Sequence, residues 1–311
     1  MKLEEGSGGA RLTLAMGKPV VFVTAASGRI GLASVQALSA KYADRVEIRA
    51  GVRNPDKADK LKALAGVAVV QAEMGAKDRL VGTFCGVDAL FIVMPGVENR
   101  VELAISTAEA AKEAGVKFTL VVSLPTVELS DTVFGKQFTE IEYKISELGV
   151  PYTFLRLPLF VENYFAFKDS IVRQSSIYLP VDPAKSFTSV VVADAGKAAA
   201  AILANYHSHT NKTYTIVSDR HTFSDVAAAF SKVLGKEIKY IRLSYVEAKQ
   251  SFMGSGYPKW KVDGILEIYE LIDSGSPIMN TDLRQQYEKL TGEKPTDLMT
   301  WVSQVAGAFK A

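Results

Sequence analysis

The alternation of predicted strands and helices is the feature that most restricts the fold of this chain. Between residues 20 and 156, short runs rich in β-branched and aromatic residues alternate with segments whose apolar residues recur at helical spacing. The predicted strands are residues 20–23, 46–52, 67–71, 89–93, 118–123 and 152–156. The predicted helices are residues 30–42, 57–64, 78–84, 100–114 and 140–148. This order is typical of βαβ units and predicts an α/β fold with a doubly wound parallel sheet.

The rhythm changes after Pro158, which indicates a second and smaller α+β lobe. The later predictions are an aromatic segment at 163–167, a short Pro-bounded segment at 178–182, helices at 193–205 and 223–234, strands at 213–217 and 237–243, and helices from 245 onward. We therefore predict three parts: a leader or expression remnant at 1–16, a large domain at 17–157, and the smaller lobe at 158–311. Part of that lobe is expected to return to the large sheet.

Composition excludes several classes of protein. The net charge is +2 and no polybasic run is present, which argues against nucleic-acid binding. Three histidines and the single Cys85 cannot form a Cys-rich zinc site or an intramolecular disulfide, so we expect no metal and a reducing, cytoplasmic location. No uninterrupted stretch of about 20 apolar residues is present, so no membrane association is expected.

Small residues follow the first predicted strand, in the segment Val23-Thr24-Ala25-Ala26-Ser27-Gly28-Arg29-Ile30-Gly31. A glycine-containing turn between a strand and a helix brings backbone N–H groups to a pyrophosphate at the positive end of the helix. We predict that this loop, from Thr24 to Gly31, binds a dinucleotide. Ala25 stands where the first glycine of such loops is usual, and we expect its φ to be negative because an alanine is strained at positive φ.

The end of the second predicted strand indicates which nucleotide is bound. A loop selective for NAD carries a carboxylate there, but this chain reads Ala50-Gly51-Val52-Arg53-Asn54. The guanidinium of Arg53 suits a 2′-phosphate, and Arg29 can cover the same group from the loop. We therefore predict NADP(H) as the cofactor.

With these features, the chain resembles the NmrA-like family of atypical short-chain dehydrogenases, which have a Rossmann fold. The resemblance extends over residues 17–309 and includes Ala72-Glu73-Met74, Phe91-Ile92-Val93-Met94-Pro95, residues 149–158 with Glu162-Asn163-Tyr164, and residues 287–295. It implies that Glu73 and Met74 lie near adenine, that Met94 and Pro95 border the cofactor, and that residues 149–164 form the wall beside the nicotinamide. The family contains NAD(P)H:quinone oxidoreductases and also NADP(H)-binding regulators.

The usual catalytic pair of short-chain dehydrogenases, Tyr-x-x-x-Lys on the helix after the fifth strand, is absent. Such spacings occur at Tyr164/Lys168, Tyr245/Lys249 and Tyr257/Lys261, none of them on that helix. Lys136 is the remaining candidate for contacting the nicotinamide ribose or donating a proton. The resemblance implies that related members carry a Lys or His two residues later, at the position that Phe138 occupies in this chain. A solvated lysine at a helix start is the alternative.

Tyr164 is the second catalytic candidate, and Asn163 and Tyr164 are predicted to line the substrate pocket. Packing in an aromatic core is the alternative for Tyr164. Quinone reduction relaxes the need for a dedicated acid, because a hydroquinone anion is far less basic than an alkoxide and can take its proton from solvent or a loosely placed donor. The segment 254–260, which contains Tyr257 and Trp260, is interpreted either as a flap over the cleft or as a loop packed on the smaller lobe.

Two functions are consistent with these residues. One is an NADPH-dependent oxidoreductase that transfers hydride to quinones or similar flat electrophiles. The other is a non-catalytic NADP(H) sensor that acts through a protein partner. An oligomer is compatible with either function.

Overall fold

The computed structural model describes residues 17–129 and 131–310, so the predicted leader at 1–16 lies outside the described residues. Within that part of the chain, seven strands form one parallel sheet in the order β10-β6-β5-β4-β1-β2-β3. They span β1 Val20–Val23, β2 Glu47–Val52, β3 Val67–Gln71, β4 Ala89–Ile92, β5 Phe118–Ser123, β6 Tyr152–Arg156 and β10 Lys212–Thr215. The predicted α/β doubly wound fold is confirmed.

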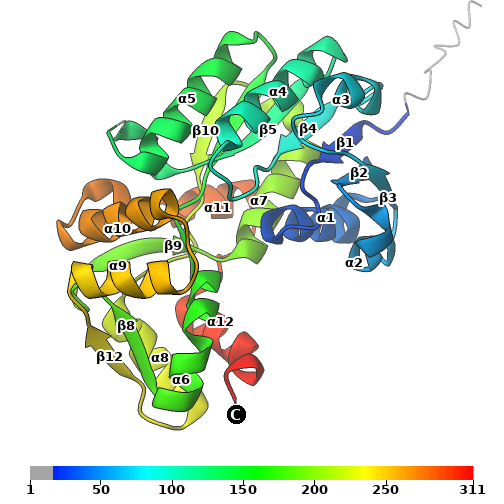
Figure 1. The fold of residues 1–311 in the computed structure, drawn as a ribbon. Helices are drawn as coiled ribbons and strands as arrows, with labels where there is room; N and C mark the ends of the chain where they lie inside the picture. The colour runs from blue at the N-terminus through cyan, green and yellow to red at the C-terminus, as the bar shows by residue number, and fades with distance from the viewer. Residues whose placement is uncertain (1–16, 130, 311) are drawn as a thin grey trace, which may run out of the picture.

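Helices cover both faces of this sheet (Figure 1). One face carries α3, α4 and α5, and the other carries α1, α2, α7 and α11. Their bounds are α1 Arg29–Tyr42, α2 Asp59–Lys62, α3 Lys77–Thr83, α4 Arg100–Glu113, α5 Val133–Glu147, α7 Val192–Ala204 and α11 Arg284–Thr291.

The residues of β1 show why the sheet needs cover on both faces. Its four residues are all buried, and alternate side chains of a strand point to opposite faces. Val21 and Val23 belong to the core beneath α1 and α7, whereas Phe22 packs with Phe84 in the core beneath α3 and α4. Continuous apolar strands of this kind are typical of parallel sheets enclosed by helices.

The remaining elements build a second core beyond the carboxyl ends of the strands. Among the described residues they include a three-stranded sheet in the order β11-β9-β7 and the parallel pair β12-β8. Strand bounds are β7 Leu159–Phe160, β8 Ser176–Leu179, β9 Ser186–Val190, β11 Asp219–Thr222 and β12 Lys239–Arg242. Helix bounds are α6 Lys168–Gln174, α8 Phe223–Leu234, α9 Tyr245–Gly254, α10 Lys259–Asp273 and α12 Leu298–Val305.

Several predicted boundaries differ from the observed ones. The helix expected at 140–148 begins at Val133, because the Thr132 hydroxyl accepts a hydrogen bond from the Gly135 N–H and caps the helix. The helix expected at 57–64 is shorter: a 3₁₀ turn at Pro55–Lys57 precedes α2. β10 and α7, although they follow residue 158, pack with the large sheet. No helix in the described part of the chain is long and apolar enough to cross a bilayer.

Candidate functional site

A cleft of about 1170 Å³ opens at the carboxyl ends of the parallel strands. Each of the strands β1 to β6 is followed by at least one residue that lines it: Ser27, Arg53, Glu73, Met94, Pro125 and Pro158. The opposite wall comes from the segment 159–167 and from α10. The carboxyl edge of a parallel sheet is where ligands of such folds bind.

The loop after β1 turns through Ala25, and here one expectation was wrong. Ala25 has φ +44°, not the negative φ that we expected. The turn that follows closes with the Gly28 N–H donating to the Ala25 carbonyl at 2.8 Å. Alanine therefore bears the strain that glycine avoids at this position.

The amino end of α1 has free donors that face the cleft. Gly28 is the N-cap residue, no side chain caps the helix, and its first turn contains no acidic residue. The first N–H groups of a helix lack partners within the helix, and they attract phosphate. Ser27, Gly28, Arg29 and Ile30 line the cleft at this helix end, so this arrangement fits the predicted pyrophosphate.

Three residues of the predicted loop support it from behind. Thr24 and Ala26 are buried; the Thr24 hydroxyl donates to the Phe91 carbonyl at 3.1 Å and accepts from the Val93 N–H at 2.8 Å. A Cβ at Gly31 would lie 2.5 Å from the Ala25 carbonyl oxygen, so only glycine fits there. These residues hold the end of β1 against β4 and the loop against α1.

Arg53 lines the cleft as predicted by its position after β2, and so does Arg29. Both are exposed, and neither forms an ion pair with any residue in 17–129 or 131–310. Glu73, Met74, Met94 and Pro95 lie along the same wall of the cleft. Two free guanidinium groups beside an anion-binding helix end fit the 2′-phosphate of NADP(H).

Lys136 is not brought to the cleft. It lies on the exposed side of α5, outside the residues that line the cavity. Its neighbour Phe138 is buried instead, packed beneath the guanidinium of Arg100. The helix start at Val133 places Phe134 and Phe138, four residues apart, on the inward face and Lys136 toward solvent.

Asn163 and Tyr164 both line the cleft, but in different ways. Asn163 is exposed, whereas Tyr164 is only 2% exposed and packs against Phe223 and Trp301. The Tyr164 hydroxyl lies 3.0 Å from Nε2 of His221. Burial raises the pKa of this phenol well above its ordinary value, which makes it a weaker proton donor than a free tyrosine.

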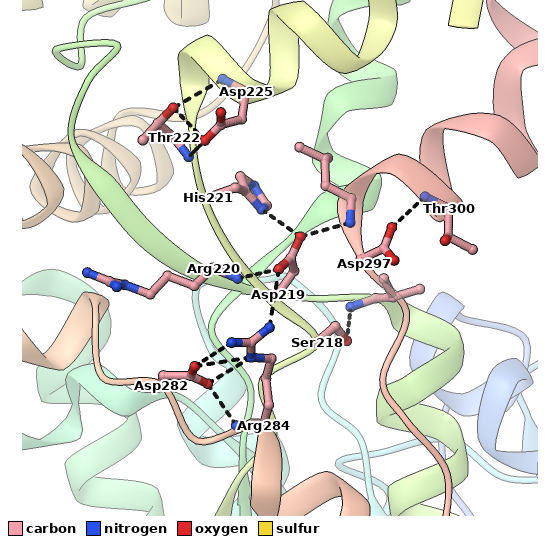
Figure 2. Close-up of polar contacts among 12 residues, drawn as sticks. Ser218, Asp219, Arg220, His221, Thr222, Asp225, Asp282, Arg284, Asp297 and Thr300 are labelled. Carbon is pink, nitrogen blue, oxygen red and sulfur yellow. Dashed lines mark hydrogen bonds and ion pairs between the residues drawn. The ribbon is translucent and has the colours of Figure 1, made fainter. Parts of the chain in front are cut away.

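His221, the partner of Tyr164, belongs to a polar cluster around Asp219, and Figure 2 shows this cluster. Nδ1 of His221 is 3.7 Å from the Asp219 carboxylate, which also accepts from the Leu298 N–H at 2.8 Å. Arg284 approaches the other carboxylate oxygen at 3.9 Å. Burial opposes the charged form of Asp219, but the contacts of its carboxylate with His221 and with the Leu298 and Arg220 N–H groups outweigh burial and lower the pKa of the carboxyl. The cluster anchors β11 to the starts of α11 and α12.

Glu162 also lines the cleft. The sequence analysis named it only as part of the Glu162-Asn163-Tyr164 segment and gave it no role. Its Oε1 accepts from the Val192 N–H at the start of α7, at 3.0 Å. Its Oε2 is buried and has no hydrogen-bond partner among the described residues. Burial raises the pKa of this carboxyl. Only tertiary structure shows this, because residues 162 and 192 are distant in the chain.

Arg100, Tyr257 and Lys261 also line the cleft. The sequence analysis gave no role to Arg100 or Lys261 and offered Tyr257 as part of a flap or of a packed loop. Lys261 Nζ lies 4.6 Å from the centre of the Tyr257 ring. Trp260 packs edge-on against Phe134 on the α5 side. The segment 254–260 thus contributes to the cleft wall. The sequence signals for this wall were the aromatic residues of segment 254–260 and the Tyr257/Lys261 spacing.

Comparison with known proteins agrees with this architecture. The model of the NmrA-like family matches residues 17–302. The chain belongs to the NmrA-like family. This confirms the predicted resemblance.

Three relatives of the chain are reductases by name. The NAD(P)H azoreductase of Xenophilus azovorans is 26% identical over 294 residues, which cover 94% of this chain and 100% of the relative. The structure of an NADPH-dependent quinone oxidoreductase from Escherichia coli in complex with NADPH has a TM-score of 0.80 and 27% identity, and the match covers 92% of this chain and 99% of the other. That of the Citrobacter sp. triphenylmethane reductase with NADP(H) has a TM-score of 0.78 and 28% identity, covering 91% and 99%.

Proposed function

We propose that this chain is an NADPH-dependent oxidoreductase that reduces quinones or similar flat, conjugated acceptors. The observation that carries the proposal is that one cleft joins the uncapped amino end of α1 and the free Arg53 to a largely aromatic wall. Similarity to azo, quinone and dye reductases supports the same class of reaction.

Different residues of the chain bind the pyrophosphate, the 2′-phosphate and the acceptor. The α1 N–H groups and Ser27 hold the pyrophosphate, and Arg53 with Arg29 holds the 2′-phosphate that distinguishes NADPH from NADH. When bound, the nicotinamide supplies a hydride to the acceptor. Aromatic residues such as Phe160 and Tyr257 give the acceptor a flat apolar surface on the opposite side of the cleft.

The reduced acceptor also needs a proton. Water can supply it, because the hydroquinone anion that hydride transfer leaves is a weak base and is stable without an acid placed beside it. Glu162 is the cleft carboxyl best suited to hold a proton, because burial raises its pKa. We do not assign this step to Lys136, which lies outside the cleft, and we keep Tyr164 as a wall residue whose hydroxyl is engaged by His221.

The test is the rate of NADPH loss with a panel of small quinones and azo compounds, with NADH in parallel. We expect NADPH-selective turnover. Arg53→Ala should weaken NADPH binding by about ten- to a hundredfold, since charge-assisted contacts contribute about 1.5–3 kcal/mol, and should leave NADH binding nearly unchanged. Arg79→Ala, which removes an exposed arginine outside the cleft, is the matched control.

The alternative of an NADP(H)-responsive regulator makes a different prediction. Tight NADPH binding with no turnover on any acceptor would favour it over the reductase. No binding of either nucleotide would overturn both functions. An Arg53→Ala variant with unchanged NADPH affinity would contradict the assignment of Arg53 to the 2′-phosphate.

A further inference from the structure

The cleft contains cationic side chains beyond the two that we assign to the 2′-phosphate of the cofactor. Its lining contains four cationic side chains, Arg29, Arg53, Arg100 and Lys261, against two carboxylates, Glu73 and Glu162. Arg29 and Arg53 belong to the proposed 2′-phosphate site. Arg100 and Lys261 are therefore left over, on the wall formed by α4 and α10.

Arg100 is held in place without a counter-ion. Its guanidinium carbon lies 5.3 Å from the ring centre of Phe134, 5.4 Å from that of Phe138 and 5.2 Å from that of Trp260. Its Nε donates to the Val97 carbonyl at 3.1 Å. In the described ranges 17–129 and 131–310, no carboxylate lies within ion-pair distance and neither Nη has a hydrogen-bond acceptor.

This arrangement leaves the charge poorly compensated. Burial lowers the pKa of Arg100 to about 10, so the side chain is still protonated at neutral pH. A half-buried cation without a carboxylate partner is costly to the folded chain unless a ligand supplies the anion. The three rings fix the guanidinium plane and leave its Nη donors free.

Lys261 extends the same wall. It follows Trp260 directly at the start of α10, and its ammonium group rests on the Tyr257 ring at 4.6 Å. It too forms no ion pair with the described residues, unlike Lys259 of the same helix, which pairs with Asp263. Gly264 makes the approach of α10 possible, since a Cβ there would lie 2.8 Å from the Phe134 ring.

We propose that Arg100 and Lys261 form a subsite for an acidic group, a carboxylate or sulfonate, on the conjugated acceptor. The inference rests on the proposed reductase function and narrows its substrates to anionic aromatic compounds. The aromatic rings around the two cations contact the flat body of the ligand, and the Nη donors of Arg100 bind the oxyanion. Cationic acceptors are disfavoured by the same charges.

Binding can be measured without turnover. Protein loaded with NADP⁺ is titrated calorimetrically with 1,4-naphthoquinone-2-sulfonate and with neutral 1,4-naphthoquinone. We expect the sulfonate to bind about tenfold more tightly, and only its affinity to fall as sodium chloride is added. Arg100→Gln should abolish that preference and Arg100→Lys should retain part of it. Lys112→Gln, the same charge change on an exposed lysine of α4 outside the cleft, should leave it intact.

The outcomes separate this subsite from the reductase proposal. Equal binding of the two quinones by the wild type, or an equal loss for both in Arg100→Gln, would overturn the subsite. A loss of NADPH affinity in Arg100→Gln as large as the loss for the sulfonate would assign Arg100 to the cofactor and overturn it too. Salt-sensitive binding of the sulfonate without NADPH oxidation would support the subsite while contradicting the reductase function. The wild-type salt series needs no variant to fold.

Discussion

Ala25 adopts the turn conformation of the loop after β1, although this conformation strains an alanine. Its φ of +44° lies in the left-handed region, where the Cβ of an alanine crowds the following carbonyl. The close approach of Gly31 to the Ala25 carbonyl leaves the turn no room to relax. The strain at Ala25 is therefore a property of the whole loop, since Gly28 and Gly31 both contact its carbonyl oxygen.

This strain predicts a stabilising substitution. Ala25→Gly should raise the free energy of unfolding by about 0.5–1 kcal/mol, because relief of the left-handed strain exceeds the greater entropy of glycine in the unfolded chain. Ala26→Gly is the matched control: Ala26 is buried and has no positive φ, so its substitution should destabilise the protein. Urea unfolding of both variants measures the difference. A lower stability for Ala25→Gly would contradict the argument.

At the scale of elements, the contact between α1 and α7 positions the helix whose amino end faces the cleft. Gly196 of α7 faces Ala33 of α1, and a Cβ at Gly196 would lie 2.6 Å from the Ala33 carbonyl carbon. The two helices thus meet backbone to backbone beneath the sheet. Because α1 begins at the cleft, a shift of this helix moves the N–H groups that we propose as the pyrophosphate site.

We therefore expect Gly196→Ala to destabilise the protein by about 1–3 kcal/mol, since the added methyl group must push the helices apart. It should also weaken NADPH binding by moving the amino end of α1. Gly82→Ala in α3 is the control, because a Cβ there meets nothing within 4 Å and alanine favours helix. Thermal unfolding and NADPH titration check both variants. Equal effects at the two positions would rule out the close-contact explanation.

At the scale of the molecule, Asp194 joins the two cores. This buried carboxylate accepts from the Ser218 hydroxyl at 2.7 Å, the Thr296 N–H at 2.8 Å and the Tyr287 hydroxyl at 3.3 Å. Ser218 leads from the large sheet to β11, and Thr296 precedes α12 of the second core. The cleft lies between these cores, so its shape depends on this junction.

Asp194→Ala should lower the free energy of unfolding by about 3 kcal/mol, because it leaves several buried donors without an acceptor. Asp44→Ala, at an exposed position without an ion pair among the described residues, should change it by less than about 0.5 kcal/mol. Denaturation followed by tryptophan fluorescence reports Trp301 in the second core together with Trp260, which packs on Phe134 of α5, and far-UV circular dichroism reports the whole chain. If the unfolding curves of Asp194→Ala coincide with each other and with those of the wild type, the Asp194 junction does not contribute to stability.

The sequence alone determined the parallel sheet, the glycine-containing loop between β1 and α1 and the place of Arg53 after β2, because these depend on local periodicity and on residues that directly follow a strand. Strands 67–71, 118–123 and 152–156 have the predicted bounds for the same reason. Only the tertiary structure decided that Lys136 points away from the cleft, that Tyr164 meets His221, and that Arg100 lies among three rings. These facts depend on contacts between segments distant in the chain and on the rotation of helices, and one sequence carries no local signal for either.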